Sequence, residues 1–265
     1  MMDDKKTVRN PFPWIGKVYK YEMKHSSRIL MPVYIAIVAI ALITGLFVPL
    51  ESDGNLNFNF SYNFDGNENV MTGLAGFFFF IYWVIIIVAA VVTISVITKR
   101  FKNGLLGDEA YLNLSLPVTI GEHLWGRILM ILSWAFISLV MMVISFFAFC
   151  IKNLSVIHIE ADWLYGIIGA VLFVLSWDLC ILLFTYLINT IGHLSKKHRT
   201  MVKLIAIIVI ISFTSRLIGG ITFNYLEHND NPATMFYWNA LFGVILSAIY
   251  GTATYFILKL KLNLE

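Results

Sequence analysis

The stretch that decides the fold is residues 71–97, which reads MTGLAGFFFFIYWVIIIVAAVVTISVI and contains no charged side chain. A helix needs roughly 20 residues to cross a hydrocarbon core about 30 Å thick, and a soluble core helix does not need an apolar run of this length. Backbone polar groups in lipid must be satisfied within the segment, so a helix is the default structure. This stretch therefore predicts a transmembrane helix.

Five further segments are long and apolar enough to span, and the whole set is 29–50, 71–97, 128–151, 164–191, 204–223 and 238–258. The composition agrees with them, because 59% of the residues are hydrophobic and only 13% are charged, about half the usual charged share of a soluble domain. The sequence predicts an all-α integral membrane protein with six transmembrane helices and excludes a soluble enzyme.

Lys and Arg are distributed unevenly between the connecting segments. Seventeen of the nineteen lie in the N-terminal segment, in 98–127, in 192–203 or in the C-terminal tail, whereas the alternate loops hold only Lys152 and one more, Arg216, lies within a span. Because positively charged loops stay on the cytoplasmic side, both termini are predicted to be cytoplasmic in a multi-pass protein of the cell membrane.

Residues 1–28 form a polar, basic segment ahead of the transmembrane domain, 29–265. Within it, residues 12–27 have the pattern of a basic amphipathic helix, with Ile15, Val18 and Tyr19 on one face and Lys17 and Lys20 on the other. We predict that this helix lies along the inner membrane interface, the alternative being a plain juxtamembrane tail. Glu22 falls on the apolar side and breaks the pattern.

The longest cytoplasmic connection, 98–127, joins the second and third spans and exceeds a simple turn. Gly107 and Asp108 favour the start of a short helix, which Pro117 would stop. Thr119 and Glu122 have the spacing of a capping box at the start of a second helix that leads into the third span. The segment is therefore predicted to be a docking element for a soluble partner or an ordinary structured loop.

Motifs of catalysis and nucleotide binding are missing from the sequence. It contains no phosphate-binding loop of the GxxxxGK[ST] type, no HExxH zinc helix and no GxSxG nucleophile elbow. We therefore expect no catalytic residues, cofactor or metal in this chain.

The run FKNGLLGDEAYLNLSLPVT, residues 101–119, resembles the cytoplasmic segment of type-2 ABC exporter permeases. It is most similar to the bacterial branch that exports antimicrobial and toxin peptides or confers resistance to them. In that branch a Gly-Asp-Glu-x-Tyr-Leu block precedes a Leu-Pro-Val-Ser/Thr block. The chain departs from many relatives between spans five and six, where residues 224–237 are polar, contain Pro232 and do not suggest a re-entrant helix.

The resemblance implies a permease that pairs with itself or a second permease and docks on a separate ABC ATPase, which would bind ATP and Mg²⁺. It implies export of an amphipathic peptide or another hydrophobic substrate by alternating access, with membrane lipid as surroundings and no nucleic acid partner. In such permeases this segment includes the coupling helix, and the resemblance implies that the ATPase-coupling residues here are Gly107, Asp108, Glu109, Tyr111, Leu112, Leu116 and Pro117. A membrane sensor or scaffold without transport activity and an ion-coupled carrier are the alternatives.

Asp178 and Arg216 are the two charges within predicted spans. Counted from the short inner loop at about 1.5 Å per residue, both lie roughly 20 Å above the inner boundary. A lone charge near the bilayer centre costs at least about 2.5 kcal/mol, which favours pairing. We expect an intramembrane pair, with separate snorkelling charges and a substrate contact as alternatives.

Overall fold

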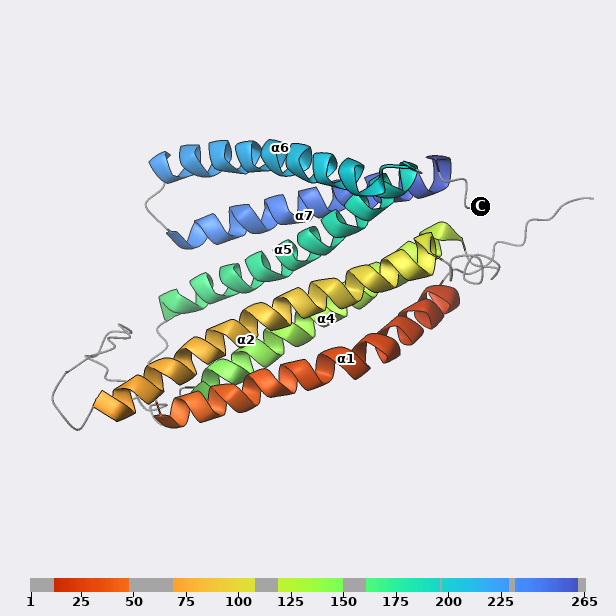
Figure 1. Ribbon diagram of the computed structural model, residues 1–265. Coiled ribbons are helices and arrows are strands. Elements are labelled where there is room, and N and C mark those ends of the chain that lie inside the picture. The colour runs from red at the N-terminus through yellow and green to blue at the C-terminus, as the bar shows by residue number, and fades with distance from the viewer. Residues whose placement is uncertain are drawn as a thin grey trace, which may run out of the picture.

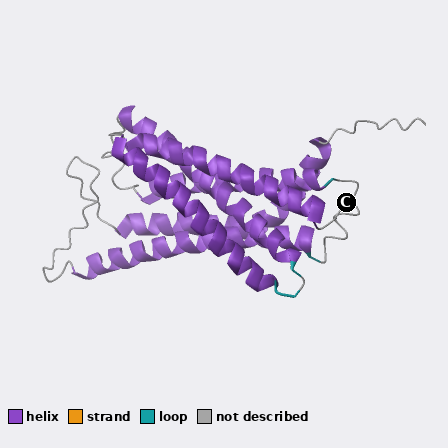
Figure 2. Ribbon diagram, turned by 90° about the horizontal axis from the view of Figure 1, so that it is seen from above, coloured by secondary structure: helices purple, strands orange, loops and turns teal. Residues whose placement is uncertain are grey.

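The computed structural model describes residues 12–47, 69–107, 119–149, 161–195, 197–228 and 232–261. These ranges form six long α-helices and two short π-helical ends: α1 (Phe12–Phe47), α2 (Asn69–Phe101), η1 (Lys102–Leu106), α4 (Ile120–Phe149), α5 (Ala161–Leu194), α6 (Arg199–His228), α7 (Pro232–Phe256) and η3 (Ile257–Lys261). No strand occurs within these ranges, in which the few residues outside helices are loop or turn (Figure 2). All six α-helices contain a segment long and apolar enough to cross a membrane.

Successive helices run in opposite directions, so that every second connection lies at the same end of the bundle (Figure 1). One end contains the start of α1, the end of α2 with η1, the start of α4, the turn between α5 and α6, and the end of α7. We call it the basic end, because every described Lys and Arg except Arg216 lies on these segments. The predicted alternation of charge along the chain thus becomes a separation in space.

Five predicted spans each lie inside one helix as far as the described residues extend, and the sixth, 238–258, runs through α7 into η3. The helices continue beyond the spans. The 36 residues of α1 correspond to about 54 Å of helix, well beyond a hydrocarbon core of about 30 Å. At the opposite end, α6 reaches His228 and α7 begins at Pro232, a residue type well suited to the first turn of a helix. Residues 224–237, where the sequence departs from the permeases that it resembles, therefore consist mainly of the end of α6 and the start of α7.

The amphipathic segment 12–27 is helical, as predicted, and has the two predicted faces, with Lys17 and Lys20 exposed and Tyr19 half-buried. Its apolar face packs on α4, where the Tyr19 hydroxyl lies 3.0 Å from Ser133 Oγ. A Cβ on Gly126 of α4 would come within 2.8 Å of Val18, so the two helices approach closely there. The segment continues into the first span without a break, as the first turns of α1. Its location at the membrane interface stays a prediction.

The six helices form two groups. In one, α1 packs along α4 and α2, and in the other, α5 packs along α7, with α6 beside them (Figure 1). Small residues permit the α5–α7 approach, since a Cβ on Gly243 would meet Ser176 and one on Gly169 would meet Tyr237. By contrast, the most apolar part of α6 has no buried residue. Contacts of α5 with α2 and α4 join the two groups.

Candidate functional site

A cluster of buried charges joins three helices at the basic end. Glu22 of α1 binds two arginines through its two carboxylate oxygens, with Oε2 3.1 Å from Arg100 Nε on α2 and Oε1 3.1 Å from Arg127 Nη2 on α4. Arg127 is only 1% exposed and also donates from Nη1 to the Phe101 carbonyl oxygen, at 3.2 Å. We call Glu22, Arg100 and Arg127 the ion cluster.

The local sequence explains why these residues meet. The apolar face of α1 turns toward α4, and Glu22 lies on that face, so its carboxylate enters the bundle. Arg100 is in the last turn of α2 and Arg127 is two turns into α4, at the two sides of the long connection between these helices. Glu22, which breaks the amphipathic pattern, is therefore the counter-ion of both arginines.

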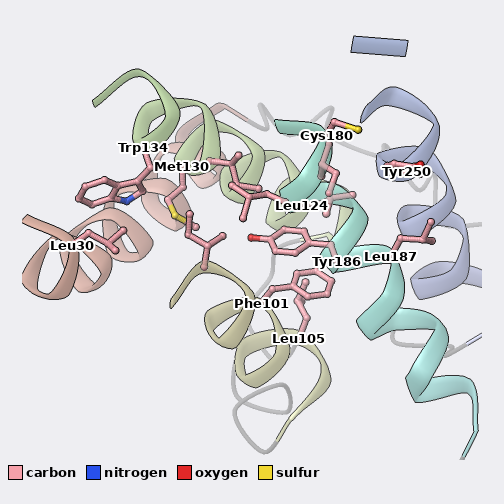
Figure 3. Close-up of a cluster of buried hydrophobic side chains, with 14 of the residues drawn as sticks. Leu30, Phe101, Leu105, Leu124, Met130, Trp134, Cys180, Tyr186, Leu187 and Tyr250 are labelled. Carbon is pink, nitrogen blue, oxygen red and sulfur yellow. The ribbon is translucent and has the colours of Figure 1, made fainter. Parts of the chain in front are cut away.

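An aromatic pair ties the fourth helix to the ion cluster. The ring of Tyr186 on α5 stacks on Phe101 with centroids 3.9 Å apart and planes 12° from parallel (Figure 3). The Arg127 guanidinium carbon lies 5.7 Å from the centre of the Phe101 ring. The Tyr186 hydroxyl is buried and has no hydrogen-bond partner in the described part of the chain. Four helices thus meet around one neutralised carboxylate.

Breaking this cluster would be costly. A buried pair of ions contributes little net stability when intact, but removing one partner leaves an uncompensated charge and typically costs about 3–5 kcal/mol. Arginine suits such a site because its planar guanidinium offers several donors at once. The cluster therefore acts mainly as a constraint on how α1, α2 and α4 are placed.

The structure describes both ends of the predicted coupling segment. At the near end, α2 passes into the π-helix η1, in which Gly104 and Leu105 are buried, and Gly107 then becomes extended with φ −108° and ψ −161°. At the far end, the predicted capping box is confirmed: Thr119 N donates to Glu122 Oε2 at 2.8 Å and Glu122 N donates to Thr119 Oγ1 at 3.3 Å. Each end adjoins a helix that carries one arginine of the ion cluster, Arg100 on α2 and Arg127 on α4.

Six of the seven predicted coupling residues lie outside the described residues. Gly107 is described, whereas Asp108, Glu109, Tyr111, Leu112, Leu116 and Pro117 fall in the range 108–118. The predicted short helix that would start at Gly107 also lies in that range.

A cavity of about 170 Å³ lies between the two helix groups, near the middle of the spans. Most of its lining is apolar, including Ile86, Trp134 and Leu182, and Asp178 of α5 is the charged residue in the lining. Among the described residues, none forms a hydrogen bond or ion pair with the Asp178 carboxylate. A charged side chain in this environment is expensive, and such residues commonly serve a function.

The structure does not bring Asp178 and Arg216 together. Each lies about 25 Å from the basic end of its helix at 1.5 Å per residue, so counting along the observed helices again gives similar depths. However, Arg216 is exposed on α6, and no ion pair joins it to Asp178 in the described part of the chain. The two helices do touch near the basic end, where Lys203 Nζ of α6 donates to Asn189 Oδ1 of α5 at 2.6 Å. Residue counting gives depth along each helix but not the lateral distance between them.

Sequence reasoning missed the ion cluster. The available signal was the single acid on the apolar face of residues 12–27, together with two arginines at the edges of the longest basic connection. A buried carboxylate requires a partner, and a search for the partner of Glu22 would have led to these arginines.

Comparisons with protein-family models, with curated proteins and with solved structures find no match to this chain.

Proposed function

We propose that this chain is the permease subunit of an ATP-driven ABC exporter that moves an amphipathic peptide or another hydrophobic substrate across the cell membrane. It would act with a separate ATPase and a second permease chain. Six helices of spanning length and the resemblance of residues 101–119 to the coupling segment of such permeases support this proposal. The gathering of basic residues at one end supports a cytoplasmic location for that end and for both termini.

The observation that carries the proposal is the anchoring of the segment that the ATPase would hold. Residues 107–119 leave from η1 and enter the capped start of α4, and both neighbouring helices are tied to α1 through Glu22. The Phe101–Tyr186 stack extends the connection to α5. A force on this segment would therefore reach four helices, whereas a loop anchored only through its backbone would absorb it.

The mechanism that follows is alternating access. Closure of the ATPase pair on ATP would move the coupling segment, and the ion cluster would carry that movement into α1, α2 and α4 as a unit. The two helix groups meet through fewer contacts than α1 with α4 or α5 with α7. A shift of one group against the other is the kind of rigid-body change that interfaces of this type allow.

The test replaces Tyr111 with Ala in the tagged chain, which is purified from its native membrane together with its partners. Because buried aromatic residues dominate binding interfaces, we expect Tyr111→Ala to lower stimulated ATP hydrolysis by about tenfold or more while membrane insertion stays normal. The matched control is Tyr21→Ala, since Tyr21 lies at the same end of the bundle and is 72% exposed.

Two results would contradict the proposal. One is full ATPase stimulation in the Tyr111→Ala complex with normal assembly, which would remove the docking role. The other is purification of the wild-type chain with a cytoplasmic partner that hydrolyses no ATP, which would favour a sensor or scaffold instead.

A further inference from the structure

The cavity beside Asp178 combines two kinds of surface that specify a ligand. Its walls are mostly apolar, with side chains from α1, α2, α4 and α5, and they enclose a volume of about 170 Å³. An engineered apolar protein cavity of about 150 Å³ holds benzene, so the space suits a group the size of one aromatic ring. The first requirement on a ligand of this cavity is therefore an apolar body of about this size.

The polar side chains in the cavity give the second requirement. Asp178 lies in the lining with the hydroxyl groups of Tyr34, Thr93 and Ser138. The Tyr34 and Thr93 hydroxyls lie 3.0 Å apart, Thr93 Oγ1 donates to the Ala89 carbonyl, and Ser138 Oγ donates to the Ala135 carbonyl. The hydroxyl oxygens keep lone pairs that can accept hydrogen bonds, and an ionised carboxylate accepts hydrogen bonds without donating any. The cavity therefore presents acceptors to a ligand that carries N–H donors.

A hard metal ion does not meet these requirements. Ca²⁺ takes six to eight oxygen ligands and Mg²⁺ demands an octahedral set, whereas this cavity has one carboxylate in an apolar wall. The described residues contain no group of three acidic, histidine or cysteine side chains that would hold a metal. An organic cation fits the apolar wall and the single charge at once.

Exposed residues at the edge of the cavity provide access for a ligand. Ala90 of α2, Met142 of α4 and Ile181 of α5 line the cavity and are exposed at the surface of the helices. In a membrane these residues would face lipid, where an amphipathic amine accumulates with its apolar part in the hydrocarbon. The cavity is thus accessible to a ligand that is already dissolved in the bilayer.

We propose that this cavity binds an organic ammonium group attached to an apolar body of about one aromatic ring, with Asp178 as the counter-ion. This inference rests on the proposed function for its biological meaning, since it makes such a cation, or one cationic group of a larger substrate, the cargo that the exporter recognises. The site suits a cargo because it lies between the two helix groups. A shift of one group against the other would change the access of the cation to the cavity.

The experiment uses the whole permease chain alone, reconstituted in nanodiscs of a zwitterionic lipid, with benzylammonium and benzyl alcohol as probes. The two probes have similar shapes and differ in charge. Affinities come from the increase in unfolding temperature with probe concentration. Because hydrogen bonds to charged groups are the stronger ones, we expect benzylammonium to bind wild-type protein at least about tenfold more tightly than benzyl alcohol.

Substitutions at Asp178 and at Ala90 test whether the probes bind in this cavity. Asp178→Asn should reduce the preference to about one, and Asp178→Ser serves the same purpose if the first variant is not monodisperse. Ala90→Phe should weaken both probes by filling the rim, whereas Val91→Phe adds the same side chain at the next position, 58% exposed and outside the lining, and should change neither.

The proposal is overturned if wild-type protein binds both probes equally or if the preference survives in Asp178→Asn. It is also overturned if Ala90→Phe binds benzylammonium as well as Val91→Phe does. These measurements need no ATPase, so their failure is distinct from failure of the proposed function. A chain that binds the amine but purifies without an ATPase keeps the site and loses its role in export.

Discussion

Glu22 and Asp178 are both acidic side chains inside the bundle, and their surroundings are opposite. Glu22, at the basic end, is bound by two arginines from two other helices. Asp178, near the middle of the spans, lies in the wall of an apolar cavity whose lining includes four hydroxyl-bearing residues. The first charge is compensated within the chain, which suits a structural constraint, and the second is open to compensation by a ligand. Under the proposed function, this contrast separates the part of the molecule that would transmit force from the part that would recognise a substrate.

The largest effect is expected at the ion cluster. Glu22→Gln leaves Arg127 buried without its counter-ion, so the free energy of unfolding should fall by about 3–5 kcal/mol. Chemical denaturation in mixed micelles measures the change. Lys24→Gln is the matched control, because Lys24 is an exposed charge on the same helix and should change stability by no more than about 0.5 kcal/mol.

A second variant distinguishes a missing partner from a general need for a carboxylate at this position. The triple variant in which apolar residues of similar volume replace Glu22, Arg100 and Arg127 should recover most of the lost stability. If Glu22→Gln unfolds at the wild-type denaturant concentration, the cluster does not constrain the helices.

An intermediate effect of opposite sign is expected at Asp178. Asp178→Asn removes a charge that no cation compensates within the described residues, so stability should stay unchanged or rise by up to about 2.5 kcal/mol. The same denaturation assay applies. The intramembrane pair expected from the sequence predicts a loss instead.

The double variant Asp178→Asn/Arg216→Gln decides between these outcomes. Without a pair, the two single effects add. A loss in each single variant that is largely recovered in the double variant would show that the two residues interact and would remove the contrast between Asp178 and Glu22.

The smallest effect is expected at the capping box beside the ion cluster. Thr119→Ala removes the side-chain acceptor for the Glu122 amide and should lower stability by about 1 kcal/mol, with faster amide exchange in the first turn of α4. Thr252→Ala is the control, because its exposed hydroxyl bonds only to carbonyls of the preceding turn of its helix. Equal effects in the two variants would mean that the cap does not hold the far end of the coupling segment.

Periodicity and hydropathy act locally, and for this reason they predicted much of the molecule. The apolar runs predicted six spanning helices and the Thr119–Glu122 spacing predicted a helix start, and both are present. Each rests on contacts within one segment: burial of a continuous apolar run, or a hydrogen bond between residues three apart. The two faces of residues 12–27 were predicted for the same reason.

What covers those faces depended on how the helices pack, and only the tertiary structure decided it. The sequence alone determined six apolar helices, their alternating direction and the concentration of Lys and Arg in alternate connections. It did not determine that α4 covers the apolar face of α1, that Glu22 meets arginines from two other helices, or that Asp178 and Arg216 remain apart at equal depth. Depth follows from the fixed rise per residue within one helix, whereas the partner of a buried charge depends on the lateral position and rotation of several helices.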